Sequence, residues 1–123
     1  VNIKNSYFDN IRDKAVSAGE ASIIKLENII IDNVGVGVAS KDGSKVNAAN
    51  IDINNYKLHA VMSYIKKDFY SQPSLIGHGI NINPIKKNAF VAQDKTFMSL
   101  NSKLINTEQI DVKELYQNEV MKK

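Results

Sequence analysis

Hydrophobic and polar residues alternate over short runs along most of the chain. The clearest pairs of apolar positions, each separated by one residue, are Ile24/Leu26, Val36/Val38, Ile51/Ile53 and Ile80/Ile82. An alternation with a period of two indicates strands that bury one face. No apolar run approaches the ~18 residues that a membrane-spanning helix needs. The pattern therefore predicts many short strands and no membrane span.

These alternating runs recur at a fixed spacing. Residues 1–5, 24–28 and 46–50 each read apolar, any, apolar, any, Asn, so the asparagines stand 23 and 22 residues apart. A second asparagine follows each of these asparagines after five residues. The segments 19–22 and 41–44 correspond to each other at the same spacing of 22 residues. Three landmarks that keep one period indicate an internal repeat.

The register continues past an insertion. Residues 51–61 match residues 80–90 with an offset of 29, so about seven extra residues lie in the segment 64–74, which has the composition of a loop. A weaker fifth unit follows 22 residues after the fourth. Its four landmarks are Phe97, Asn101, Leu104 and Asn106, which answer Leu75, Gly79, Ile82 and Pro84.

Two or three short strands in about 22 residues bury a face only if the chain winds as a coil and each turn stacks on the last. The sequence thus predicts an all-β fold, a parallel β-helix of about 4–5 turns over residues 1–106. Asn tolerates left-handed backbone, and its amide can bond to the next turn, so the repeating asparagines are expected to form corner ladders. The two ladders are Asn5, Asn28 and Asn50, and Asn10, Asn33 and Asn55, with Gly79 and Pro84 at these positions in the fourth unit.

Residues 107–123 follow a different pattern. Asp111 with Glu114 resembles a capping box, and Val112, Leu115, Tyr116 and Val120 would share one helical face. We expect a short helix or an irregular tail that caps the last turn; the alternative is one more strand through Ile110 and Val112. Val1 enters the repeat without a cap, which predicts preceding β-helix turns or end-to-end self-association.

The segments 15–55 and 60–70 resemble right-handed parallel β-helix repeats of the pectate-lyase-like superfamily, which includes carbohydrate-binding and sugar-hydrolase repeats. The resemblance covers roughly residues 1–96. It implies a right-handed coil, and it leaves the activity open, because the superfamily contains lyases, hydrolases, epimerases, phage tailspikes and structural stalks.

Composition supports the strands and narrows the chemistry. Sixteen Ile and ten Val stand against six Leu, and β-branched residues favour strands. The chain has no cysteine, which excludes disulfides, thiol catalysis and cysteine metal sites. The net charge of +3 comes from fifteen Lys and one Arg interleaved with acidic residues, a solvated surface rather than a nucleic-acid interface.

One edge of the coil gathers residues that could carry chemistry. Stacking places Glu20 near Asp42, with Lys66 approaching, and such a group could transfer a proton at a sugar carbon. Glu20, Asp42 and Lys66 are therefore weak catalytic candidates, and their carboxylates could alternatively bind Ca²⁺. The competing interpretation is a charged ladder on the outer face that stabilises the stack. No other cofactor is expected, and a metal site that joins His59 and His78 is not expected.

The insertion is the most distinctive patch, because it does not repeat. Aromatic rings stack on sugar faces, and lysines bind hydroxyls or acidic sugars, so this loop is the candidate carbohydrate site. The alternative is that its aromatic side chains only pack the loop onto the coil. The candidate residues are Tyr64, Lys66, Lys67, Phe69 and Tyr70.

The sequence leaves three functions open. The first is a non-catalytic carbohydrate-binding or structural module of a larger bacterial protein, located outside the cell, in the periplasm or on the cell surface, with a polysaccharide or cell-surface glycan as partner. The second is a fragment of a polysaccharide lyase, hydrolase or epimerase. The third is a self-association or stalk element.

Overall fold

The computed structural model describes residues 1–121 and is nearly all β. Residues 122 and 123, the end of the predicted 107–123 cap, lie outside the described residues. The elements in chain order are β1 (Asn2–Ala18), β2 (Ile23–Lys41), β3 (Lys45–Tyr64), β4 (Ser74–Asn83), β5 (Phe90–Gln93), β6 (Phe97–Leu100), β7 (Lys103–Leu104), β8 (Thr107–Glu108) and α1 (Val112–Leu115).

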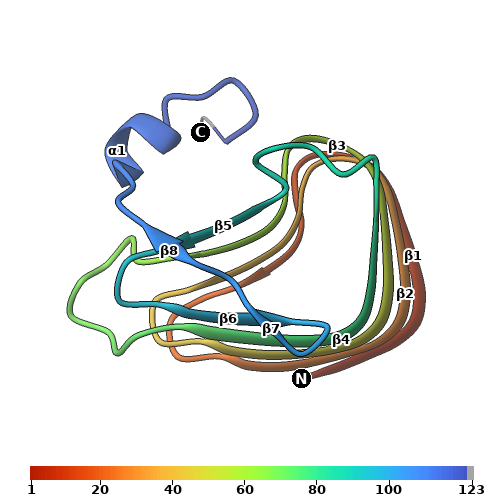
Figure 1. The fold of residues 1–123 in the computed structure, drawn as a ribbon, viewed down its shortest axis with the longest axis horizontal. Coiled ribbons are helices and arrows are strands. Elements are labelled where there is room, and N and C mark those ends of the chain that lie inside the picture. The colour runs from red at the N-terminus through yellow and green to blue at the C-terminus, as the bar shows by residue number, and fades with distance from the viewer. Residues whose placement is uncertain (122–123) are drawn as a thin grey trace.

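The three long strands lie side by side in parallel and bend together at the same corners (Figure 1). Ile3 pairs with Leu26 and Leu26 with Ala48, so the sequence offsets of 23 and 22 are the strand register. The first half of β3 then pairs with β4 and its second half with β5, both 29 residues on. The predicted all-β, parallel arrangement is confirmed, and it fits a β-helix-like repeat.

The core consists of apolar columns that run through the stack. Ile29, Ile51 and Ile80 are partners in successive strands, and all three are buried. Packing is tightest where two strands approach closely. A Cβ atom on Gly37 of β2 would lie 2.5 Å from the carbonyl oxygen of Ala60 in β3. Because β-branched side chains have few rotamers to lose on a pleated surface, they suit these columns, which explains why Ile and Val outnumber Leu.

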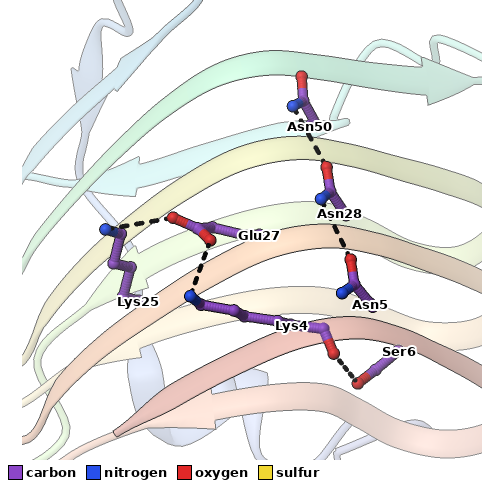
Figure 2. A network of polar contacts seen from close by, with 7 residues as sticks. All are labelled: Lys4, Asn5, Ser6, Lys25, Glu27, Asn28 and Asn50. Atoms are coloured by element: carbon purple, nitrogen blue, oxygen red, sulfur yellow. Dashed lines mark hydrogen bonds and ion pairs between the residues drawn. The ribbon is translucent and has the colours of Figure 1, made fainter.

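The first corner is an asparagine ladder (Figure 2). Asn5, Asn28 and Asn50 have positive φ angles of 51°, 55° and 58°. Nδ2 of Asn28 donates to Oδ1 of Asn5 at 3.1 Å, and Nδ2 of Asn50 donates to Oδ1 of Asn28 at 3.3 Å. The sequence prediction for this corner is confirmed.

The second corner is only partly a ladder. Asn10, Asn33 and Asn55 again have positive φ, and Asn33 donates to Asn10. Asn55, however, donates at 2.9 Å to Oδ1 of Asp32. The predicted positive φ is present at all three positions, but the side-chain hydrogen bonds link only Asn10 and Asn33, because Asn55 bonds to Asp32 and not to Asn33.

The fifth unit follows the repeat only as far as its corner. β6 pairs in parallel with β4, but 23 residues on: Met98, not Phe97, lies beside Leu75, so the predicted offset of 22 is wrong by one residue. Asn101 then turns the corner with φ 53°. The chain then folds back, and β7 pairs antiparallel with β6, so Leu104 lies beside Ser99 instead of following Ile82. The prediction that Leu104 and Asn106 continue the stack is wrong.

The C-terminal helix begins at the predicted residue but packs elsewhere than predicted. Asp111 is the N-cap of α1, and its Oδ1 accepts from the backbone N–H of Glu114 at 3.1 Å. The helix does not lie over the last turn as expected. Its apolar side chains pack against the flank of β2 and β3, in a second hydrophobic cluster that contains Val36, Ala39, Met62, Tyr64 and Met121. One face of β2 and β3 packs into the main core, and the opposite face also carries apolar side chains. The helix and the residues after it cover that opposite face.

The alternative of a further strand through Ile110 and Val112 is also wrong, since the added strand is Thr107–Glu108, paired with β5. Among residues 1–121, no helix is long and apolar enough to cross a membrane.

Candidate functional site

The candidate site begins at the turn between β2 and β3. Asp42 has a φ of 52° and is buried. Its Oδ1 accepts from the backbone N–H groups of Lys66 and Lys67, at 2.8 and 2.7 Å. The carboxylate therefore holds the first residues of the insertion loop. Asp42 was predicted as a weak catalytic candidate, and in the structure its carboxylate is occupied by the backbone and closed to solvent.

The loop is anchored at both ends. The backbone N–H of Ile65 donates to Oε1 of Gln93 at 2.7 Å, and the N–H of Ser74 donates to the carbonyl of Ser44 at 3.0 Å. The carbonyl of Pro73 accepts from the N–H of Phe97 at 3.2 Å. With β3 ending at Tyr64 and β4 beginning at Ser74, the extra residues occupy the segment that the register predicted.

Glu20 and Lys67 form an ion pair on the outside of this edge. Both side chains are exposed. The hydrogen bond from Lys67 holds the pKa of Glu20 below its ordinary value, with smaller contributions from the charges of Lys67, Lys41 and Lys66. The same bond raises the pKa of Lys67. Glu20 is thus ionised and paired, and it does not face the buried carboxylate of Asp42 across an open space.

Tyr64 is buried under the tail, and Lys66, although exposed, lies over Tyr116 of the tail. Tyr64 is fully buried, and its hydroxyl lies 2.7 Å from that of Tyr116. Burial raises the pKa of Tyr64 far above its ordinary value, and the bond to Tyr116 adds to this. The ammonium of Lys66 lies 4.4 Å from the centre of the Tyr116 ring. A sugar could not reach the ring of Tyr64, so its predicted role in carbohydrate binding is wrong.

The loop presents an exposed aromatic residue, Phe69, beside the half-buried Tyr70. Phe69 is 76% exposed, and its ring centre lies 4.6 Å from that of Tyr70 with the planes 34° apart. Lys67 and Glu20 stand beside this pair through their ion pair. The result is a ring pair with one exposed and one half-buried member, on a loop with fixed ends, next to the ammonium of Lys67 and the carboxylate of Glu20.

Two clefts border the C-terminal segment, and neither was predicted from the sequence. One, of about 970 Å³, lies between the start of the insertion loop and α1, and it includes Lys66, Gln93 and Tyr116. The other, of about 550 Å³, lies on the opposite side of α1, between His59 and Glu114. Both exist because the tail packs on the flank of the sheet, and local patterning does not specify that docking position.

The remaining titratable candidates lie apart from the loop. Nδ1 of His59 lies 2.6 Å from the carbonyl oxygen of Asn88, and burial lowers the pKa of this imidazole. His78 lies with Lys25 and Asn47 around a shallow hollow of about 150 Å³ on the outer face of the sheet. Arg12 donates to the backbone carbonyl of Glu119 at 3.1 Å, which ties the tail to β1. Across residues 1–121, no group of three His, Asp or Glu side chains could hold a metal ion.

The outer face of the sheet carries charges in register (Figure 2). Glu27 lies between Lys25 and Lys4, with carboxylate–ammonium distances of 3.1 and 3.6 Å. The bond from Lys25 holds the pKa of Glu27 below its ordinary value, and Lys4 contributes less. Lys4 and Glu27 are partners in neighbouring strands, so this is a cross-strand charge pair of the kind that stabilises stacking.

Comparisons with known proteins add no relative to this description: the chain matches no protein-family model, no curated protein and no solved structure.

Proposed function

We propose that the chain is a section of right-handed parallel β-helix that acts as a non-catalytic carbohydrate-binding module. The observation that carries the proposal is the Phe69–Tyr70 ring pair, with Phe69 exposed, on a loop whose start is fixed by Asp42 and Gln93. A rigid scaffold lowers the entropy lost on binding, and an exposed ring offers its face to the C–H groups of a sugar. Lys67 and Glu20 supply charged partners for hydroxyl groups at its edge.

Binding outside catalysis is favoured by the state of the acidic residues. Oδ1 of the buried Asp42 accepts hydrogen bonds from two backbone N–H groups, and Glu20 forms an ion pair with Lys67. The alternative, a fragment of a polysaccharide lyase, hydrolase or epimerase, requires a carboxylate that is free to exchange a proton with a sugar. Cleavage or epimerisation of a polysaccharide by the purified chain, abolished by Asp42→Ala, would favour that alternative.

A glycan array with the purified chain tests the binding proposal. We expect hits that weaken at least about tenfold in Phe69→Ala and Tyr70→Ala, because each change removes aromatic contact area. Ile23→Ala is the matched control, since Ile23 is also apolar and exposed but lies on the strand edge. An array without hits, or equal losses in the control, would contradict the proposal. Such a module fits a larger bacterial protein outside the cytoplasm, where glycans are present.

A second function, self-association or attachment to further turns, is supported by β1. Within residues 1–121 this 17-residue strand pairs only with β2, so its other edge presents unpaired backbone groups. Ile3, Phe8 and Ile11 are only partly buried at that edge, although they pack on the main core. An edge of this length recruits another strand unless it is blocked.

Sedimentation over a range of concentrations tests this second function. Ile3→Lys should abolish any dimer by placing a charge on the open edge, whereas Ile105→Lys, at the opposite end of the core, should leave it intact. A strict monomer at all concentrations would contradict self-association.

A further inference from the structure

The strongest remaining feature is a cleft at the C-terminal end of the stack. It has a volume of about 360 Å³ and lies between the connection that leads into β5 and the segment that begins with β7. Ile85 and Leu104 both line it, and they are 78% and 62% exposed. Single exposed apolar residues are ordinary, but two large ones that share a cleft form a surface that water disfavours.

The charge of this cleft is one-sided. Lys86, Lys87 and Lys103 line it, and its remaining lining is apolar apart from Asn106. Lys86 is held, because its ammonium donates to the carbonyl of Tyr56 at 3.0 Å. No salt bridge in the described chain joins Lys87 or Lys103 to a carboxylate. Two uncompensated ammonium groups therefore flank the two exposed apolar side chains.

Both apolar residues stand on backbone that is held in place. The hydroxyl of Tyr56 donates to the carbonyl of Pro84 at 2.6 Å and accepts from the N–H of Lys86 at 2.9 Å, which brackets Ile85. Leu104 lies in β7, paired with Ser99 of β6. The exposure of these side chains is therefore built into the fold and does not depend on a loose loop.

We propose that this cleft docks the chain onto an anionic membrane surface. Apolar side chains that enter the boundary between headgroups and acyl chains, together with lysines that bind anionic headgroups, are the two components of peripheral membrane binding. A sugar would need more hydrogen-bonding groups than this lining offers. A nucleic acid would need Arg or stacked aromatic side chains, and the cleft has no Arg. The surface is distinct from the Phe69–Tyr70 loop, so either proposal can fail alone.

Co-sedimentation of the full chain with vesicles tests the proposal. We expect binding to vesicles of phosphatidylcholine with about one third phosphatidylserine, little binding to phosphatidylcholine alone, and weaker binding as salt increases. Each lysine near such a surface contributes about a fivefold gain in affinity, so the Lys87→Gln/Lys103→Gln variant should bind about 25-fold more weakly. Ile85→Ser/Leu104→Ser should lose about tenfold or more, since the apolar contact is removed.

Matched control variants distinguish binding through this cleft from nonspecific binding to vesicles. Lys45→Gln/Lys113→Gln removes the same charge elsewhere on the exposed surface, and Ile23→Ser removes a similarly exposed apolar group. Both variants should bind vesicles as the unchanged chain does. Equal losses in the controls, or no preference for anionic vesicles, would overturn the proposal. It would also be overturned if soluble polyglutamate bound as tightly and Ile85→Ser/Leu104→Ser had no effect, because the cleft would then be a site for acidic polymers.

Discussion

The two ends of the strand stack are built by different means. From β1 to β3 the chain repeats itself, with Asn5, Asn28 and Asn50 turning one corner in three successive strands. Beyond β4 the repeat ends, and side-chain contacts that occur at single positions take its place. The side chain of Asn101 accepts from the N–H of Ile80 at 2.9 Å and donates to its carbonyl at 3.0 Å, in place of a paired strand. Repetition extends the stack, and non-repeating side chains terminate it.

The interior of the regular region should be the most sensitive part of the chain. Ile53 is fully buried between its neighbouring strands, so Ile53→Ala should lower the free energy of unfolding by about 3 kcal/mol. At the terminating end, Leu104→Ala should cost less than about 0.5 kcal/mol, because Leu104 is exposed. Urea denaturation measures both. Similar losses would mean that the two ends are equally ordered and that the comparison is wrong.

Asp42 links the regular region to the insertion. Asp42→Ala leaves two backbone N–H groups without their acceptor and should cost about 2 kcal/mol. Asp42→Asn keeps an oxygen acceptor and tolerates positive φ, so it should retain most of the stability. Thermal denaturation distinguishes them. If the Asn variant were as unstable as the Ala variant, the carboxylate would have a role beyond accepting these bonds.

The corner ladder can be separated into backbone and amide contributions. Asn28→Ala places a Cβ residue without a polar side chain at positive φ and should cost about 1–2 kcal/mol. Asn28→Gly relieves the backbone but still loses the bonds to Asn5 and Asn50, so its smaller loss measures the ladder itself. A glycine variant as unstable as the alanine variant would show that the amides dominate.

The smallest effect is expected from pH. Burial lowers the pKa of His59 from 6.5 in the folded chain. The unfolded chain therefore binds more protons, and stability is lost as the pH falls through about 6.5. His59→Gln should lessen this loss between pH 7 and pH 5 in urea denaturation. An unaltered pH profile in His59→Gln would contradict the assignment.

The repeating part of the fold could be predicted from the sequence, because each strand imposes the same local demands. Positive φ at a corner favours Asn or Gly, and a buried column favours alternating β-branched residues, so the positions of Asn5 and Ile53 could be predicted from the local pattern. Leu104 could not be placed this way. β6 pairs with β4 one residue out of the predicted register, and the reversal at Ser102 depends on pairing back to β6. No local pattern separates those two outcomes.

The candidate site was predicted in part for the same reason. The insertion breaks the period, so the loop could be located from the sequence, and Phe69 is exposed as a sugar-binding loop requires. The burial of Tyr64 depends on Tyr116, which is 52 residues away and reaches it only because the tail docks on the flank of β2 and β3. Long-range packing of this kind leaves no mark in the spacing of residues.

Nuclear Overhauser effects across the strands test the central claim most directly. The account predicts contacts of Ile31 with both Phe8 and Ile53, in the pattern of parallel strands. Within residues 1–121, it predicts close α-proton contacts of the antiparallel type only between β6 and β7. Antiparallel contacts between β1 and β2, or between β2 and β3, would contradict the stacked repeat.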